Sequence, residues 1–400
     1  MKTQSIFIFT NGCGRRQLDA EKLKNYFKIN DFRIAKNPRD AECIIFISCA
    51  FIKNREDESF KIIKNFKKFK KKLIVAGCLP EISKNKLSQI FKGKTLSVKN
   101  LNEIDNIFKD FKFKFSSIPD ANLISSSTSP LLPILSAKKN LKEVFVKDSL
   151  NLIKGRFINN LKNKLNPLST SHYIRISHGC LGNCSYCSIR RAIGTLKSKP
   201  IEICKEEYKK ILKSGSKHIV IFADDVGAYG LDINSSFPRL LNEFLKIDIK
   251  NISYWQIKEL NARWIIKYEK ELLEIIRKNK IKHMLCGIQS GSDRILGLMN
   301  RQNNSGELIA ALKKFKKADP NLKISAQIII GFPSENESDF MATLNLIKQT
   351  KFNEVILYPY SDREGTVAFQ INPKIPDNIK KERIKTAINF LRKEKINYCL

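Results

Sequence analysis

Three cysteines occur within eight residues of the chain, in the segment Cys-Leu-Gly-Asn-Cys-Ser-Tyr-Cys. They are Cys180, Cys184 and Cys187, and they follow a short run that is typical of a buried strand. Because iron–sulfur clusters take cysteine thiolates as ligands, these sulfurs can hold three irons of a 4Fe-4S cubane. The fourth iron would have no protein ligand, and an open metal position is chemically useful. The alternative is a structural zinc site with His178 as fourth ligand.

A second set of cysteines occupies equivalent places in the first part of the chain. Cys13, Cys49 and Cys78 each follow directly after an apolar run that we interpret as a strand. Since the carboxyl ends of parallel strands share one edge of a sheet, these three residues can converge on one metal site. The alternative is a chance placement, because buried cysteine is common. We expect core filling or an idle thiol for the other four cysteines, Cys43, Cys204, Cys286 and Cys399.

The elements that position these cysteines follow a β/α rhythm in two regions. In the first region, strands are expected at 5–10, 41–48 and 72–76, with helices at 17–27 and 53–70. In the second, strands are expected at 173–177, 218–223, 252–257, 283–289, 323–330 and 354–358, and helices at 201–213, 236–246, 268–279, 305–318, 337–349 and 377–396. The fold class is therefore α/β: an N-terminal parallel-sheet α/β domain and a partial (β/α)6 TIM-type barrel.

We assign residues 1–114 to the first domain and residues 169–400 to the barrel. Residues 115–168 are rich in Ser, Pro and Lys and are expected to form a linker with one helix near 147–163. In parallel β/α folds ligands bind at the carboxyl ends of the strands, so the residues just after each strand are the candidates for chemistry.

The composition bounds the class of protein. Of the 400 residues, 42% are hydrophobic and 28% are charged, which is typical of a globular chain. The net charge of +34 would attract polyanions, so RNA is a candidate partner, although compositional drift also accounts for such a charge. No run approaches the length of a membrane span, so no membrane association is expected. Ten cysteines in a cytoplasmic, reducing compartment favour metal binding or catalysis over disulfides.

The cysteine loop ahead of a six-unit partial barrel resembles the radical S-adenosylmethionine enzymes. The longer string GCLGNCSYCSIRRAIGTLKSKP resembles their methylthiotransferase family, especially the branch that acts on threonylcarbamoyladenosine in tRNA. The resemblance implies that Cys180, Cys184 and Cys187 bind a 4Fe-4S cluster whose free iron chelates S-adenosylmethionine, the source of a 5'-deoxyadenosyl radical. The motifs TNGC, ISC and AGCLP match the family's amino-terminal domain. This match implies a second 4Fe-4S cluster on Cys13, Cys49 and Cys78, associated with sulfur delivery.

Further motifs of the family follow the barrel strands. They are Asp225 in a D-x-x-A-Y-G pattern, the QSGS segment, a GFPxE element and a Y-S-x-R-x-G-T segment. The resemblance implies cofactor-binding roles for Tyr186, Asp225, Gln289, Ser290, Gly331 and Glu335. We also expect five basic residues to contact the substrate: Arg190, Arg191, Lys197, Lys199 and Arg363. For Asp19, which follows the first cysteine, we expect helix capping.

The sequence departs from the family in two respects. Ile193 stands where the family has arginine, and no C-terminal RNA-binding module follows the last barrel helix, so a separate RNA-binding chain is a possible partner. We expect methylthiolation of an unactivated C-H bond, on a modified adenosine beside the tRNA anticodon, with an external electron donor and a sulfur donor. The alternatives are methylthiolation of a ribosomal-protein aspartate and a non-catalytic iron-sulfur RNA-binding protein.

Overall fold

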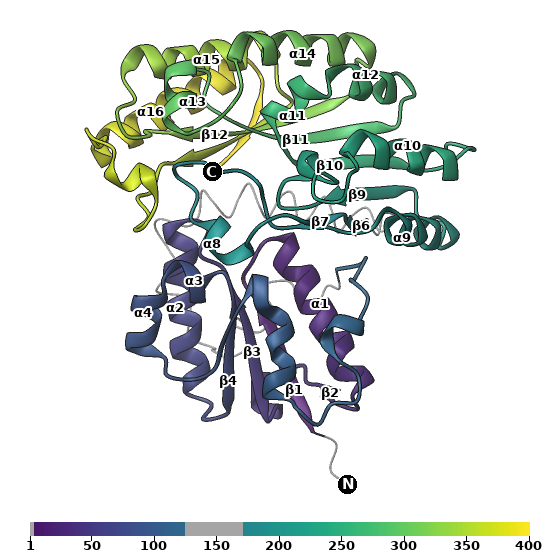
Figure 1. Cartoon of the computed structure of the whole chain (residues 1–400). Helices are drawn as coiled ribbons and strands as arrows, with labels where there is room; N and C mark the ends of the chain where they lie inside the picture. Colours follow the sequence, from purple (N-terminus) through teal and green to yellow (C-terminus); the bar gives the residue numbers. More distant parts are fainter. Residues whose placement is uncertain (1–3, 125–170) are drawn as a thin grey trace. The chain divides into compact units, whose positions relative to one another are not determined.

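The computed structural model describes residues 4–124 and 171–400, and the chain divides into two compact units (Figure 1). Within these ranges the first unit contains residues 4–124 and 188–194, and the second contains residues 171–187 and 195–400. The helix expected at 147–163 and most of the expected linker lie outside the described residues. None of the helices in the two described ranges has the length and apolar character that a membrane crossing requires.

A five-stranded parallel sheet forms the centre of the first unit. In spatial order its strands are β2 (Arg33–Ile34), β1 (Ser5–Thr10), β3 (Cys43–Ser48), β4 (Lys72–Gly77) and β5 (Thr95–Ser97). In residues 4–124 its α-helices are α1 (Gly14–Ile29), α2 (Lys53–Lys67), α3 (Leu79–Ile82), α4 (Lys84–Ile90) and α5 (Ile104–Ile107), and residues 188–194 add α8 (Ile189–Ile193). Strands β1 and β3 are buried along their whole length, which explains why their sequences are continuous apolar runs.

Aromatic residues close one end of the core of this unit. The ring of Phe27 packs edge-on against Phe108 at 4.9 Å, and Tyr26 packs edge-on against Phe115 at 5.6 Å. Phe115 and Ile118 are buried in the same core, so it includes side chains beyond residue 114.

The second unit is built on a seven-stranded parallel sheet. In spatial order its strands are β14 (Asn397–Cys399), β13 (Glu354–Pro359), β12 (Lys323–Ile330), β11 (Ile281–Gln289), β10 (Tyr254–Asn261), β9 (His218–Phe222) and β6 (His172–Arg175). Its helices are α9 (Ile201–Lys213), α10 (Phe237–Ile247), α11 (Ala262–Lys267), α12 (Glu269–Arg277), α13 (Asp293–Leu298), α14 (Ser305–Ala318), α15 (Glu337–Thr350) and α16 (Asp377–Lys393). This arrangement confirms the expected α/β class and partial barrel.

The two faces of this sheet differ in chemistry. Alternate residues of the strands, such as Ile221, Ile257 and Met284, pack with helix residues such as Leu240 and Phe315 in one continuous core. Because side chains alternate across a strand, the residues between them face away from the helices. That second face carries many polar side chains.

The sequence did not predict every element. Helix α16 ends at Lys393, short of the expected 396, and the chain then forms β14, whose Tyr398 pairs with Val355 of β13. Cys399 therefore lies in an edge strand. The short elements β2, β5, α11 and α13 were also missed, because two to six residues carry little periodicity.

A buried ion pair holds the turns that precede β10 and β11. The ammonium group of Lys280 is fully buried and donates to the carboxylate of Asp248 and to Ser253 O. Burial alone would raise the pKa of Asp248, but Lys280 and the backbone N–H of Ile252 hold that pKa at about 2. The same ammonium lies 5.4 Å from the ring centre of Trp255, so the charge is paired on two sides.

We predict that Lys280→Met destabilises the second unit by roughly 3–5 kcal/mol, because Asp248 is left as an unpaired buried charge. Urea unfolding followed by tryptophan fluorescence measures this effect, since both tryptophans lie in that unit. The matched control is Lys282→Met, which removes a more exposed lysine two residues away and should change stability by about 0.5 kcal/mol or less. Adding Asp248→Asn to Lys280→Met should recover part of the loss, and no recovery would contradict this account.

Candidate metal and cofactor site

The loop that carries Cys180, Cys184 and Cys187 follows the short strand β7 (Ser177–His178), which pairs with β8 (Lys197–Ser198). All three cysteines are partly exposed. The backbone N–H of Gly182 donates to Cys180 Sγ at 3.1 Å. A Cβ atom on Gly182 would lie 3.2 Å from Cys180 Sγ, which is a crowded distance, and 3.8 Å from Cys184 Sγ, which is an ordinary contact. The loop therefore brings two sulfurs to one small residue.

The segment after α13 anchors this loop. Ser185 Oγ donates to Leu298 O at 2.7 Å, Ser185 N donates to Met299 O at 3.0 Å, and Asn300 Nδ2 donates to Asn183 O at 2.8 Å. Arg301 completes the contact, because its Nη1 donates to Cys184 Sγ at 3.8 Å. This contact places a positive charge beside one of the three candidate metal ligands.

Sequence reasoning missed this role of residues 298–301. The contacts join residues more than a hundred positions apart in the chain, so local pattern alone could not show them.

Asp225 lies on the other side of the cysteine loop. Its Oδ2 accepts hydrogen bonds from Trp264 Nε1 at 3.0 Å and Arg263 Nη2 at 3.3 Å, and it lies 3.9 Å from Cys180 Sγ. Its Oδ1 is buried and has no hydrogen-bond partner among the residues that the structure describes. The side chain of Asp225 does not cap the helical turn that follows it. A buried carboxylate oxygen with spare acceptor capacity fits an ammonium group.

The charge of Asp225 also acts on the nearest thiol. Burial raises the pKa of Cys180 to about 12, and the neighbouring Asp225 carboxylate adds to that rise. Neighbouring Asp224 has a different function, because its Oδ2 accepts the backbone N–H of Gly179 at 2.9 Å and so fixes the start of the loop. Asp224 therefore binds the backbone of the loop, whereas Asp225 raises the pKa of the Cys180 thiol.

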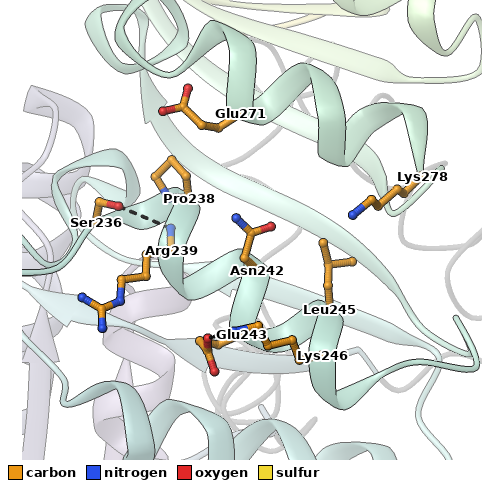
Figure 2. Close-up of a pocket in the computed structure, with 9 residues that line it drawn as sticks. All are labelled: Ser236, Pro238, Arg239, Asn242, Glu243, Leu245, Lys246, Glu271 and Lys278. Atoms are coloured by element: carbon orange, nitrogen blue, oxygen red, sulfur yellow. Dashed lines mark hydrogen bonds and ion pairs between the residues drawn. The ribbon is translucent and has the colours of Figure 1, made fainter.

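A small pocket of about 90 Å³ opens at this loop. It is lined by Cys184 and by polar side chains from the ends of β10 and α13, among them Asn261, Arg263 and Arg301. A larger hollow of about 790 Å³ lies on α10 and α12 (Figure 2). Its lining includes no cysteine or histidine, and Glu243 there pairs with Lys246 at 2.6 Å. The smaller pocket therefore has the metal-binding chemistry.

The QSGS residues form a turn after β11. Gln289 adopts φ +76°, a left-handed conformation that is uncommon for a residue with a side chain. Ser290 is buried, and its hydroxyl pairs with Thr343 Oγ1 at 3.3 Å and accepts the N–H of Ser292 at 3.1 Å. The serine hydroxyl thus stabilises the turn, and Gln289 is the member of this segment with the strained backbone.

The GFPxE element is held in a similar way. Glu335 Oε1 accepts the backbone N–H of Gly331 at 3.0 Å and pairs with Arg383 at 2.8 Å. Gly331 adopts φ +76°, which glycine tolerates without steric cost. Glu335 therefore shapes the loop whose backbone carries Gly331.

The basic residues that we expected near the loop are not equivalent. Arg190 and Arg191 lie on the short helix α8 (Ile189–Ile193), which belongs to the first unit, where Lys99 Nζ donates to Arg191 O at 3.1 Å. Lys197 is exposed on β8, whereas Lys199 pairs with Glu207 at 2.7 Å. Arg363 is buried, with 7% of its surface exposed.

The first unit brings Cys13, Cys49 and Cys78 to one edge of its sheet. Each follows one of the three adjacent strands β1, β3 and β4. The N–H of Cys49 donates to Asn11 Oδ1 at 3.0 Å, and the N–H of Cys78 donates to Ser48 O at 3.0 Å. The expected convergence of the three strand ends is therefore present.

Glycine is required directly before Cys78. Gly77 adopts φ +104°, and a Cβ atom at this position would lie 2.3 Å from Ser48 O. A side chain would therefore collide with the backbone of the neighbouring strand.

Two arginines balance the charge of this second set of thiols. Cys13 is exposed at the surface, and although loss of water around its sulfur favours the neutral thiol, the guanidinium groups of Arg15 and Arg16 lower its pKa below the usual range. Burial raises the pKa of Cys78 to about 12, which Arg16 opposes. Asp19 does not cap α1 as we expected, because it lies inside the helix and pairs with Arg16 at 3.0 Å, both side chains being buried.

Each site has three thiols as its donor set. Among residues 4–124 and 171–400, no three Cys, His, Asp or Glu side chains are grouped as they would be around one metal ion. Cysteine thiolates are the ligands that iron–sulfur clusters take. Cations beside the sulfurs and, at the barrel loop, a buried acceptor on Asp225 suit a negatively charged cluster and an amino-acid ligand.

We predict that Asp225→Asn makes Cys180 of the metal-free protein more reactive. Removing the carboxylate charge lowers the pKa of the thiol part of the way towards its usual range, so the thiolate fraction rises by up to about tenfold for one pKa unit. Peptide mass spectrometry of iodoacetamide alkylation measures the rate. Asp377→Asn, which removes a surface charge, should have no effect, and an unchanged rate in Asp225→Asn would contradict the contact.

Comparison with known proteins agrees with this geometry. A model described as the radical SAM superfamily matches residues 174–347, and one described as uncharacterized protein family UPF0004 matches residues 5–98. The tRNA-2-methylthio-N(6)-dimethylallyladenosine synthase of Thermosipho melanesiensis is 31% identical, over 98% of this chain and 84% of that protein. The probable threonylcarbamoyladenosine tRNA methylthiotransferase of Pyrococcus abyssi is 30% identical, over 94% and 81%.

Two further comparisons extend this result. The ribosomal protein uS12 methylthiotransferase RimO of Acetivibrio thermocellus is 28% identical over 98% of this chain and 82% of that protein. Among solved structures, the radical S-adenosylmethionine methyltransferase TsrM of Kitasatospora setae matches with a TM-score of 0.61 and 11% identity, over 92% of this chain and 77% of that one. At that identity the likeness shows the fold alone. The radical SAM match implies a 4Fe-4S cluster and S-adenosylmethionine as cofactors. The chain belongs to the radical S-adenosylmethionine methylthiotransferase family, and it is an enzyme of that family.

Proposed function

We propose that this enzyme attaches a methylthio group to adenosine beside the anticodon of tRNA, and that its adenosine carries a threonylcarbamoyl group. The observation that carries the proposal is the pair of three-cysteine sites, one in each unit, in a chain related over most of its length to tRNA methylthiotransferases. The net charge of +34 supports a polyanionic substrate.

In this proposal the barrel loop holds the cluster that binds S-adenosylmethionine. Cys180, Cys184 and Cys187 would be its ligands, with the Arg301 guanidinium beside Cys184 to offset the thiolate charge. When bound, the cluster and S-adenosylmethionine supply the radical that removes hydrogen from an unactivated carbon. Asp225 Oδ1 is the acceptor that we assign to the ammonium group of S-adenosylmethionine. Gln289, Ser290, Gly331 and Glu335 shape the turns around this site, and Tyr186 lies between two of the cysteines.

The first unit would hold a second 4Fe-4S cluster on Cys13, Cys49 and Cys78, associated with sulfur delivery. Arg15 and Arg16 support this role, because they stabilise negative charge at the edge where the three thiols meet. An external electron donor and a sulfur donor are required partners. Lys197 is the exposed basic residue that we assign to RNA contact near the barrel loop, together with Arg190 and Arg191.

The direct test compares the nucleosides of bulk tRNA from a strain with the gene and a strain without it. We predict that the deletion strain lacks one methylthio nucleoside and accumulates its threonylcarbamoyl precursor. Wild-type chain supplied in trans should restore the nucleoside, whereas Cys180→Ala, Cys184→Ala and Cys187→Ala should each fail to do so. Unchanged nucleoside mass spectra in the deletion strain would contradict the tRNA proposal.

The second cluster has its own test. We predict that protein with Cys13, Cys49 and Cys78 replaced by alanine keeps about half of the iron that the wild-type chain binds after anaerobic reconstitution, because one of two clusters is lost. It should still cleave S-adenosylmethionine but transfer no sulfur. The matched control replaces Cys43, Cys204 and Cys286, which lie in strands and a helix, and should keep all the iron. Full iron content in the first variant would contradict the second site.

A second candidate substrate is a ribosomal-protein aspartate. The relative named as a uS12 methylthiotransferase favours it, since that protein is matched over 98% of this chain. Assays of the purified enzyme with tRNA and with ribosomes, in parallel, separate the two substrates.

A further inference from the structure

The face of the barrel sheet opposite its packed helices carries a polar cluster that the proposed chemistry does not use. It consists of His218 on β9, Gln256 and Lys258 on β10 and His283 on β11, which are neighbouring strands (Figure 1). Their strand neighbours Ile219, Ile257 and Met284 pack in the core beneath the helices, so the cluster faces the opposite way. The interior of a barrel sheet is commonly filled by apolar residues, so this polar face requires an explanation.

Hydrogen bonds define the charge state of one side of this cluster. Ser325 Oγ donates to Glu354 Oε2 at 3.3 Å, so it accepts from His283 Nε2 at 2.8 Å. The Nδ1 atom of His283 must then accept from Gln256 Nε2, 2.6 Å away. Burial lowers the pKa of His283 to about 4, which agrees with a neutral ring. His283 is therefore neutral and adds no positive charge to the cluster.

Lys258 is the cation of the cluster. Its ammonium lies 6.0 Å from the ring centre of Tyr173, and it has no hydrogen bond or ion pair with any residue of the described ranges. Burial lowers its pKa, and its charge in turn contributes to the lowered pKa values of His218 and His283. The carboxylate of the neighbouring Glu259 acts on this ammonium from a distance, but no ion pair joins the two groups, so the half-buried charge of Lys258 would gain from an anionic ligand in direct contact.

The backbone of β10 is irregular at this residue. Ile257 pairs with Met284 and Leu260 with Cys286, so β10 has one residue more than β11 in this interval. Glu259 within it adopts φ +65°, which is uncommon for a residue with a side chain. Bulges of this kind redirect a side chain and are frequent beside active sites. Here the bulge directly follows Lys258.

Lys258 lies on the strand that leads to the cluster loop. Asn261, three residues further along β10, lines the small pocket at Cys184. Three strand residues span at most roughly 10 Å of backbone, so a ligand that is held in that pocket and extends along β10 towards its amino-terminal end approaches the ammonium of Lys258, which lies beside Tyr173.

We propose that Lys258, with His218 and Gln256 beside it, forms a subsite for a carboxylate carried by the substrate base. The proposal rests on the proposed function and deepens it: the subsite selects adenosine whose N6 substituent ends in an amino-acid carboxylate, the threonylcarbamoyl form. A dimethylallyl substituent is an uncharged hydrocarbon and would leave the ammonium of Lys258 without a partner. Sites built around a polar contact discriminate strongly against analogues that lack it.

The test measures binding of synthetic anticodon stem–loop RNAs to the anaerobically reconstituted full chain. Three RNAs differ only beside the anticodon: threonylcarbamoyladenosine, its methyl ester, and dimethylallyladenosine. We expect the wild-type enzyme to bind the carboxylate RNA about tenfold or more tightly than the ester, as for a hydrogen bond to a charged group. Lys258→Met should abolish that preference, and Lys258→Arg should retain part of it.

Matched controls separate this subsite from a general loss of structure. Lys282→Met removes a lysine from the adjacent strand on the opposite face and should keep the full preference. Tryptophan fluorescence verifies that Lys258→Met is folded. Equal binding of carboxylate and ester RNAs by the wild-type enzyme, or an undiminished preference in folded Lys258→Met, overturns the proposal.

The outcomes also distinguish the subsite from the proposed function. If no RNA gains a methylthio group in the same preparations but the Lys258-dependent preference is present, the subsite stands and the assigned reaction fails. If all three RNAs are methylthiolated with equal efficiency and equal affinity, the reaction stands and the subsite fails. A Lys258-dependent affinity for an aspartyl peptide of a ribosomal protein, without any preference among the RNAs, overturns the assignment to RNA.

Discussion

Keeping three thiolates together is an electrostatic problem, and most features of both candidate sites serve to solve it. A thiol that is withdrawn from water resists ionisation, as the raised pKa values of Cys180 and Cys78 illustrate. Metal binding nevertheless requires the anion. In the barrel the compensation comes from Arg301 and from the N–H of Gly182, and in the first unit it comes from Arg15 and Arg16. The same solution thus occurs twice, on unrelated backbones.

Parallel strands supply the second requirement, which is convergence. In the first unit the adjacent strands β1, β3 and β4 each end at a cysteine. In the barrel the cysteines share one loop, and the strand ends supply its surroundings: Asp225 follows β9 and the Gln289 turn follows β11. Chemistry at one edge of a sheet depends on residues that are far apart in sequence, and packing on the helix side of the sheet holds them in register.

Much of this could be predicted from the sequence, and the failures have physical causes. Apolar runs located the long strands, and cysteine spacing located both sets of thiols, because each signal is local. The role of Arg301 could not be predicted from local sequence, because its contact with Cys184 joins positions 117 residues apart. Asp19 was misread because a carboxylate near a helix start usually caps it, whereas here a buried arginine takes it as a partner. Lys258 was not singled out, since a single lysine in a strand has no local signature.

The glycine before Cys78 bears on how such enzymes diverge. Its backbone conformation and its closeness to the carbonyl of Ser48 exclude every larger residue, whatever chemistry takes place nearby. A descendant that had lost the thiol of Cys78 would still keep this glycine for steric reasons. Across a lineage, persistence of the glycine therefore reports that the sheet survives and says nothing about the neighbouring thiol.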